Sequence, residues 1–189
     1  MPRSPQKPMV VVITGEKLAG KEVAAQYFVR HYGFKHYNSS DILSNILRLL
    51  HLPISRVNHM NLVGSLRERF GGGVLAETVK KQIQEHKEKR AIFAGLRHPV
   101  EYDVLSKMPG FLLVYITAPL PVRFARAKAR KEKAGESKFT LSDFKREEKL
   151  VTELFIQKLG KKAKVKLVND GSLKDLYKQI EEKIVKNYL

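Results

Sequence analysis

MVVVITGEKLAGK, which spans residues 9–21, is the stretch that decides the fold. Residues 9–13 are an unbroken apolar run, which is typical of a strand buried on both faces. Residues 15–21 form a loop bounded by two glycines, and its last residue, Lys21, stands where a helix begins. This order of strand, loop and helix is typical of a phosphate-binding loop, because backbone N–H groups of the loop and of the helix N-terminus point at phosphate oxygens. The sequence therefore predicts a site for a nucleoside triphosphate.

The residues of this loop have specific expected roles. Gly15 and Gly20 permit backbone dihedrals and close approaches that a Cβ would prevent, and Lys21 is expected to reach the β- and γ-phosphates. The next residue is usually Ser or Thr, whose hydroxyl holds magnesium, but here Glu22 and Val23 follow. Glu22 either contacts a hydrated magnesium ion or, as a first-turn acid, stabilises the helix dipole. The predicted nucleotide-binding residues of the loop are Gly15, Glu16, Lys17, Leu18, Ala19, Gly20, Lys21 and Glu22.

Short apolar runs alternate with longer helical patterns along the rest of the chain. Five strands alternating with helices predict an α/β fold of three layers, in which a five-stranded parallel sheet carries helices on both faces. The strands are expected at 9–13, 35–37, 91–94, 111–117 and 165–168, and the helices at 21–32, 39–50, 61–70, 74–87, 121–133, 141–159 and 173–184.

The length of 189 residues fits one domain with a full hydrophobic core. We expect this domain to span 9–189, after a short mobile tail at 1–8. Helical segments at 39–73 and 130–160 are interpreted as insertions between core strands, the first for binding an acceptor and the second resembling a lid.

Composition excludes several classes of protein. Hydrophobic residues make up 43% and charged residues 29%, a globular profile, and no apolar run is long enough to cross a bilayer. The chain has no cysteine, which excludes disulfides and thiolate metal sites, and no secretory signal, so a cytoplasmic protein is expected. The net charge of +17 attracts anions, and nucleic acid, a polyphosphate substrate and plain solubilising charge all remain open explanations.

Polar residues that follow later strands are expected at the same edge of the sheet. Asp41 follows the strand at 35–37 and Arg97 follows the strand at 91–94. Ligands of open parallel sheets bind beyond the carboxyl ends of the strands, so both side chains should lie close to the phosphate loop. Asp41 could orient or deprotonate an acceptor hydroxyl, hold magnesium through water, or simply stabilise a helix N-terminus. Arg97 suits bidentate recognition of a phosphate, and a solvated loop arginine is the alternative.

Further arginines lie on a strongly basic helix. Arg123, Arg126 and Arg130 are spaced by three and four residues, so they share one helix face. They could belong to a mobile lid that neutralises charge during phosphoryl transfer. Arg67, which precedes the glycines at 71–73, is a similar candidate. An ordinary basic, solvated surface is the alternative for each of them.

Together these residues resemble the nucleoside monophosphate kinase group of P-loop enzymes, most closely the adenylate kinase-like and dephospho-CoA kinase-like proteins, over residues 9–186. The segment NSSDIL at 38–43 resembles the acid-bearing segment that helps to place the acceptor. AGLR at 94–97 resembles the Asp-Gly-x-Arg segment, whose arginine binds the acceptor phosphate. The arginines at 123–130 stand where the family carries lid arginines, and VNDG at 168–171 resembles a segment near the base of the phosphate donor.

The resemblance implies ATP or another triphosphate as donor, magnesium, and a phosphorylated small molecule as acceptor. Two positions that usually organise magnesium depart from the family, because the hydroxyl after Lys21 is missing and Ala94 replaces the acid. The predicted catalytic residues are Lys21, Asp41, Arg97, Arg126 and Arg130. Arg123 and Asn169 are added to the predicted donor site, and Asp41, Arg67 and Arg97 form the predicted acceptor site. The candidates for a magnesium ligand are Glu22 and Asp41.

Three functions follow from this interpretation. The leading hypothesis is ATP-dependent phosphoryl transfer to a nucleoside monophosphate or a dephospho-CoA-like acceptor. The departures at Glu22, Val23 and Ala94 favour the alternative of a nucleotide-binding protein that has lost catalysis and acts through a partner. An RNA-associated protein that uses the +17 charge ranks last, because no RNA-binding motif is present. The sequence predicts no membrane partner and leaves the oligomeric state open.

Overall fold

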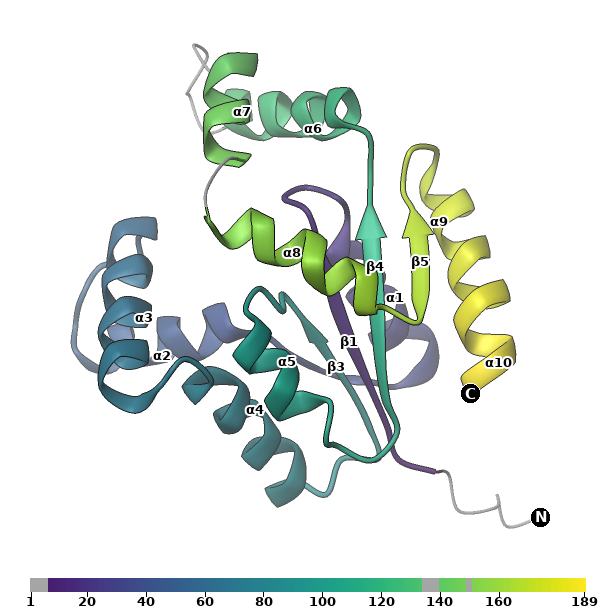
Figure 1. Ribbon diagram of the computed structural model, residues 1–189, viewed down its shortest axis with the longest axis horizontal. Helices are drawn as coiled ribbons and strands as arrows, with labels where there is room; N and C mark the ends of the chain where they lie inside the picture. Colours follow the sequence, from purple (N-terminus) through teal and green to yellow (C-terminus); the bar gives the residue numbers. More distant parts are fainter. Residues whose placement is uncertain (1–6, 134–139, 149–150) are drawn as a thin grey trace.

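A five-stranded sheet, in which each strand runs parallel to its neighbours, forms the centre of the protein (Figure 1). The structure is a computed structural model and describes residues 7–133, 140–148 and 151–189. The strand order is β2-β3-β1-β4-β5, which confirms the predicted five-stranded parallel sheet. The strands are β1 (Met9–Gly15), β2 (Lys35–Tyr37), β3 (Arg90–Ala94), β4 (Phe111–Thr117) and β5 (Val165–Val168).

The continuous apolar sequence of β1 follows from its place at the centre of the sheet. The strand pairs with β3 on one side and β4 on the other, so Val12 lies between Phe93 and Leu113. Every residue of β1 is buried. Side chains of a strand alternate between its two faces, so Val12 contacts one layer of helices while Val11 and Ile13 contact the other.

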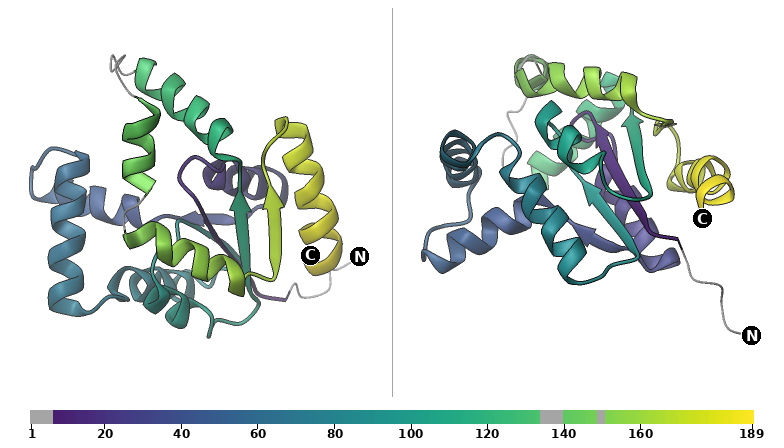
Figure 2. Two further views of the ribbon diagram at one scale, coloured as in Figure 1. Left: turned by 45° about the horizontal axis from the view of Figure 1, so that its top comes forward. Right: turned by 60° about the horizontal axis from the view of Figure 1, so that its bottom comes forward.

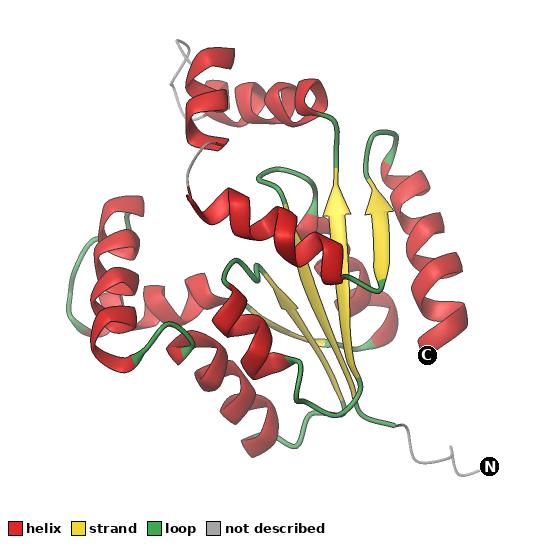
Figure 3. Ribbon diagram, viewed as in Figure 1, coloured by secondary structure: helices red, strands yellow, loops and turns green. Residues whose placement is uncertain are grey.

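Helices cover both faces of the sheet and complete the three layers (Figures 2 and 3). On one face α1 and α9 pack against the strands, and Phe28 and Ile180 are fully buried there. On the other face α4, α5 and α8 contribute Val79, Leu105 and Leu159, respectively, to a second apolar cluster. The bounds of these helices are α1 (Lys21–Tyr32), α4 (Val74–Glu85), α5 (Pro99–Leu105), α8 (Val151–Lys162) and α9 (Leu173–Ile180).

The remaining helices lie outside these layers or at the end of the chain. None of the helices in the described ranges is both long and apolar enough to cross a bilayer. The remaining elements are α2 (Ser39–Leu49), α3 (Arg56–Phe70), α6 (Leu120–Lys133), α7 (Leu141–Glu148), a π-helical turn (Glu181–Val185) and α10 (Lys186–Tyr188).

Three helices differ from the prediction. The helix predicted at 61–70 begins earlier, at Arg56, because the Ser55 side chain caps it by accepting a 3.1 Å hydrogen bond from the backbone N–H of Asn58. The prediction of a single helix at 141–159 was wrong, because two helices, α7 and α8, occupy this region and run in different directions (Figure 1). Helix α5 has no counterpart in the prediction.

The predicted acceptor insertion at 39–73 corresponds to α2 and α3, which lie to one side of the sheet, away from α9 (Figures 1 and 2). Helix α3, which the structure describes throughout, contributes no buried residue. A 3.0 Å hydrogen bond joins the Ser44 hydroxyl on α2 to His59 Nε2 on α3. Part of the predicted lid region at 130–160 and most of the predicted tail at 1–8 lie outside the described residues. The division into these regions therefore stays a prediction.

A carboxylate joins the C-terminal helices to α1. Glu181 accepts hydrogen bonds from the hydroxyls of Tyr27 and Tyr32, both at 2.6 Å. These two bonds, that from Tyr27 first, lower the pKa of Glu181, while burial and the bond to Glu181 raise the pKa of Tyr32 to about 12. The ionised carboxylate is thus the form that the folded protein favours.

We expect the contribution of Glu181 to stability to depend on pH. Its pKa is lower in the folded than in the unfolded chain, so the contribution is complete above the unfolded value, about 4.3, and is lost as the pH falls through the folded value. Urea unfolding should therefore show Glu181→Gln less stable than wild type at pH 7, with the difference disappearing in acid. If wild type and Glu181→Gln differ in unfolding free energy by the same amount at pH 7 and in acid, the ionised carboxylate of Glu181 is not the source of the stability.

Candidate functional site

The phosphate loop connects β1 to α1 at the carboxyl end of the strands, where α6 also begins (Figure 1). Its two glycines lie where a larger residue has no room. At Gly15, φ is +152° and a Cβ would lie 2.0 Å from the carbonyl oxygen of Ile116 on β4. At Gly20, φ is +105° and a Cβ would lie 2.2 Å from Asn169 Nδ2. Both glycines are required because neighbouring atoms approach the backbone directly.

Lys21 is the first residue of α1 and its side chain folds back over the loop. Its Nζ donates hydrogen bonds to the carbonyl oxygens of Gly15, at 2.6 Å, and Glu16, at 2.7 Å. The ammonium therefore lies beside the loop backbone and the N-terminus of α1, and both are positive where a phosphate group would bind. The structure thus brings together the glycines, the lysine and the helix end that the sequence predicted.

Glu16 has a role within the loop that the sequence did not reveal. Its Oε1 accepts a hydrogen bond from the Tyr115 hydroxyl and a second, of 3.2 Å, from Thr117 Oγ1. Burial and this carboxylate raise the pKa of Tyr115. The Glu16 side chain therefore ties the loop to β4. Its Oε2 is buried and has no hydrogen-bond partner among the described residues.

Two side chains from other elements contact the far side of the loop. Arg126 on α6 donates to the carbonyl oxygen of Leu18 at 3.1 Å, and Asn169 Nδ2 donates to that of Ala19 at 2.8 Å. Arg126 also donates to the carbonyl oxygen of Asn169, at 3.1 Å, and to its Oδ1, at 3.2 Å. Asn169 follows β5, and its backbone N–H donates to Thr117. Arg126, predicted as a catalytic residue, and Asn169, predicted for the donor site, are therefore next to the loop.

The other two arginines of α6 have different surroundings. The Arg123 side chain is buried, its Nε donates to the carbonyl oxygen of Ala118 at 2.8 Å, and its guanidinium lies over the ring of Phe144 on α7. Arg130 is exposed near the end of the helix. The three arginines predicted to share one helix face thus differ in their surroundings. Arg123 is buried against Phe144, Arg126 contacts the loop, and Arg130 is exposed to solvent.

The loop after β3 lies against the end of β1. Backbone N–H groups of Gly95 and Leu96 donate to the carbonyl oxygen of Ile13, and the Thr14 hydroxyl donates to that of Leu96 at 2.8 Å. These bonds place the half-buried Arg97 beside the start of the phosphate loop. The predicted approach of this segment to the phosphate site is therefore present in the backbone.

Glu101 on α5 was not predicted, although it organises this same segment. The carboxylate is only 2% exposed and accepts from the backbone N–H groups of Arg97, at 3.1 Å, and His98, at 3.2 Å. Its other oxygen accepts from Arg67 on α3 at 2.6 Å. Glu101 therefore links the predicted acceptor arginines. Its position three residues after the helix cap His98 is the sequence signal of a capping box.

The acidic candidates for magnesium are both exposed. Glu22 Oε1 accepts from Gln26 Nε2 at 3.0 Å and lies 3.6 Å from His36 Nδ1, so it is directed along α1 and towards β2. Asp41 lies in the first turn of α2, but Asn38, whose side chain accepts from the backbone N–H of Ser40, caps that helix.

The described residues do not fit a magnesium ion in the usual way of phosphate-loop proteins. Ala94 at the end of β3 offers no oxygen ligand from its side chain, and Glu22 offers a carboxylate that is already hydrogen-bonded. Among the residues that the structure describes, no group of three or more His, Cys, Asp or Glu side chains could hold a metal. Ala94 and Glu22 thus do not supply the magnesium ligands that phosphate-loop proteins usually have.

Comparison with known sequences finds distant relatives. No protein-family model matches the chain. A UPF0200/UPF0201 protein of Archaeoglobus fulgidus is 25% identical over 181 residues, which are 94% of this chain and 55% of that protein. A UPF0200 protein of Saccharolobus solfataricus is 24% identical over 94% of this chain and 95% of its own length. A deoxycytidylate deaminase of Schizosaccharomyces pombe is 28% identical over 71% of this chain and 36% of the deaminase. The chain thus spans about half the length of the first relative.

Comparison with solved structures identifies the fold. Shikimate kinase from Acinetobacter baumannii in complex with shikimate matches with a TM-score of 0.58 at 14% identity, covering 97% of each chain. Dephospho-CoA kinase from Campylobacter jejuni matches with a TM-score of 0.56 at 17% identity, covering 95% of this chain and 96% of that one. The chain has the P-loop kinase-like fold, as predicted. The finer resemblance to nucleoside monophosphate kinases stays a hypothesis.

Replacing Gly20 by alanine should disrupt the loop, because the new Cβ would collide with Asn169 in a backbone conformation that favours glycine. We expect Gly20→Ala to lower the free energy of unfolding by about 1–3 kcal/mol, measured by urea denaturation. Gly64→Ala is the matched control, since a Cβ in this exposed helical position meets nothing within 4 Å and should stabilise α3. Equal effects of the two substitutions would contradict the crowding at Gly20.

Removing the Glu101 carboxylate should loosen the contact between α3 and the Arg97 segment. Glu101→Gln leaves Arg67 without its charged partner and should cost about 3 kcal/mol of unfolding free energy, as for other buried pairs. Arg146→Gln, which breaks an exposed pair with Asp143, should change stability little. In a double-mutant cycle, purely additive effects of Glu101→Gln and Arg67→Gln would show that the pair is not coupled.

Proposed function

We propose that the protein binds ATP or another nucleoside triphosphate at Gly15–Lys21 and transfers its terminal phosphoryl group to a small phosphorylated acceptor. The phosphate loop carries this proposal. Its glycines are enforced by close contacts with Ile116 and Asn169, and Lys21 lies at the N-terminus of α1. Such a loop binds phosphate through backbone N–H groups and a single lysine, which would be Lys21 here.

The donor side of the proposed site uses the loop and the elements behind it. Lys21 would leave its own loop carbonyls for the β- and γ-phosphates, which offer the ammonium a full negative charge. Asn169, at the end of β5, lies where the resemblance places the base of the donor. Arg130, exposed on α6, would approach the phosphates as a mobile lid arginine and spread positive charge over the transferred group.

The acceptor side is proposed at the carboxyl ends of β2 and β3. Arg97 would bind the acceptor phosphate, since its segment is hydrogen-bonded to the end of β1, and Asp41 would orient the acceptor hydroxyl from the first turn of α2. Arg67 stands behind Arg97, paired with Glu101, and would add positive charge to the same region. Transfer then depends mainly on positioning and charge neutralisation.

The names of similar proteins support a nucleotide-type or otherwise small acceptor without selecting one. Shikimate kinase and dephospho-CoA kinase share the fold, and one distant relative is a deoxycytidylate deaminase. The +17 charge is compatible with a polyphosphate donor together with a phosphorylated acceptor, because both are strongly anionic. A nucleoside monophosphate or dephospho-CoA remains the proposed acceptor class.

A second candidate function is nucleotide binding without transfer, through which the protein would act on a partner. The altered magnesium positions favour it, since Ala94 has no carboxylate and Glu22 is directed along α1. Loss of these groups removes interactions that stabilise charge during transfer, while the binding loop stays complete.

The proposed transfer is tested with γ-labelled ATP against a panel of nucleoside monophosphates, dephospho-CoA and shikimate. We expect labelled product with one class of acceptor, and a loss of at least about 100-fold in rate for Lys21→Ala, because a preorganised charge at the reacting phosphate is removed. Lys161→Ala, an exposed lysine on α8, is the control for loss of charge. Protein that binds ATP but yields no product with magnesium or manganese would favour the second candidate.

Supplying the missing hydroxyl should change how the loop responds to magnesium. We expect ATP affinity of the wild type, measured by calorimetry, to change little between magnesium and EDTA. Glu22→Thr places a hydroxyl directly after Lys21 and should bind ATP about tenfold more tightly with magnesium than without. This ratio corresponds to ~1.4 kcal/mol of binding free energy. Glu22→Gln removes the charge without adding the hydroxyl and is the control. A wild-type affinity that already depends steeply on magnesium would show that another group serves the metal.

A further inference from the structure

Arg126 makes contacts that a lid arginine reaching for phosphates would not need. Its guanidinium donates to the carbonyl oxygens of Leu18 and Asn169 and to the Asn169 Oδ1, all between 3.1 and 3.2 Å. Three acceptors on two separate segments therefore fix the orientation of one side chain. Since a guanidinium has five N–H donors in a rigid plane, such a set of contacts is both strong and directional.

Leu18 is the residue of the loop that most needs an external partner. Its φ of +63° lies in the left-handed region, which costs a residue with a Cβ about 1–3 kcal/mol. A hydrogen bond of 3.2 Å from the backbone N–H of Ala19 to the carbonyl oxygen of Glu16 closes a tight turn that contains Leu18. The bond from Arg126 is made to the carbonyl of this strained residue itself.

Asn169 completes the support from the β5 side. Its Nδ2 donates to the carbonyl oxygen of Ala19 at 2.8 Å, and its own Oδ1 is one of the acceptors of Arg126. The side chain is only 4% exposed. Arg126 and Asn169 therefore bind two successive carbonyls of the loop and also bind each other, so that the loop, α6 and the end of β5 form one hydrogen-bonded unit.

We infer that Arg126 is a positioning residue, which holds Leu18 in its left-handed conformation and so keeps the phosphate loop in the shape that accepts a nucleotide. This inference rests on the proposed nucleotide site and assigns to α6 a role in donor affinity. Because the guanidinium is bound to backbone carbonyls, its effect on the phosphates is exerted through the loop. The loop is thereby shaped before a nucleotide arrives, which lowers the ordering cost of binding.

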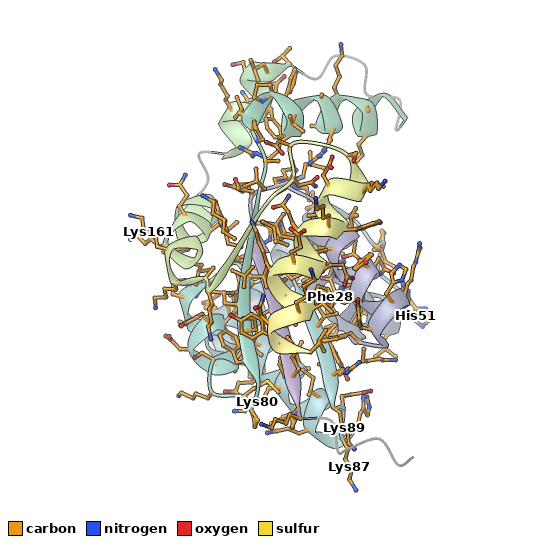
Figure 4. All side chains as sticks on the ribbon, turned by 90° about the vertical axis from the view of Figure 1, so that its right-hand side faces the viewer. Phe28, His51, Lys80, Lys87, Lys89 and Lys161 are labelled. Carbon is orange, nitrogen blue, oxygen red and sulfur yellow. The ribbon has the colours of Figure 1, made fainter. Side chains whose placement is uncertain are left out.

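The inference predicts a specific rescue between two positions. Arg126→Ala should weaken binding of a non-hydrolysable ATP analogue about tenfold, measured by calorimetry, because the loop relaxes from the strained turn. In a Leu18→Gly background, Arg126→Ala should weaken binding of the analogue only about threefold, since glycine adopts a positive φ without support. Lys161→Ala, an exposed charge on α8 that is labelled in Figure 4, should leave the affinity unchanged.

Kinetics and hydrogen exchange separate this role from a catalytic one. If the protein turns over, Arg126→Ala should raise the KM for ATP and leave kcat within about twofold, whereas a phosphate-contacting arginine would lower kcat at saturating ATP. Amide exchange at residues 15–20 should accelerate in Arg126→Ala without any nucleotide. This readout keeps the inference testable even if wild type fails to bind nucleotide, an outcome that would overturn the proposed function alone.

Two results would overturn the inference. One is unchanged amide exchange in the loop of Arg126→Ala, and the other is an equal loss of affinity in the wild-type and Leu18→Gly backgrounds. Should Arg126→Ala prove unfolded by its thermal transition, Arg126→Gln, which keeps an amide donor, replaces it in the same cycle with Leu18→Gly.

Discussion

The close approach of Gly15 to the carbonyl oxygen of Ile116 is the contact on which the rest of the site depends. It brings the chain, at the last residue of a fully buried central strand, so near to β4 that no side chain fits. The backbone must turn there, and it reaches the N-terminus of α1 within a few residues. A strand, a turn and a helix end are thereby fixed relative to one another by sterics and by the hydrogen bonds of the sheet.

Around this turn, long polar side chains are directed at the loop backbone. Lys21, Arg126 and Asn169 all donate to carbonyl oxygens of the loop, while the Glu16 carboxylate anchors it to β4. These contacts hold the backbone of the loop, whose N–H groups would bind phosphate in the proposed site. The same side chains that lend the region its positive charge therefore also determine its shape.

The proposed acceptor side is organised by one buried carboxylate. Glu101 binds the backbone of the Arg97 segment and the guanidinium of Arg67, and so connects α5 with the otherwise weakly attached α3. A buried charge of this kind is favourable only when its hydrogen bonds are satisfied, and here each oxygen has a partner. The two predicted acceptor arginines thus have different tasks, since one is part of a buried pair and the other stands beside the phosphate loop.

The sequence by itself determined the parallel sheet, the phosphate loop and the edge at which the candidate site is proposed. These features are local: apolar runs, paired glycines and a lysine at a helix start have the same meaning wherever they occur. Only the tertiary structure decided how Arg67, Arg123 and Arg126 divide their roles, and that Glu16 and Glu101 are anchors. Arg67 pairs with Glu101, Arg126 reaches Leu18 and Asn169, and Glu16 binds β4. These partners lie far away in the chain, so spacing within the sequence does not record them. A long charged side chain can reach solvent, a carbonyl or a carboxylate from the same helix face, and packing alone selects among these.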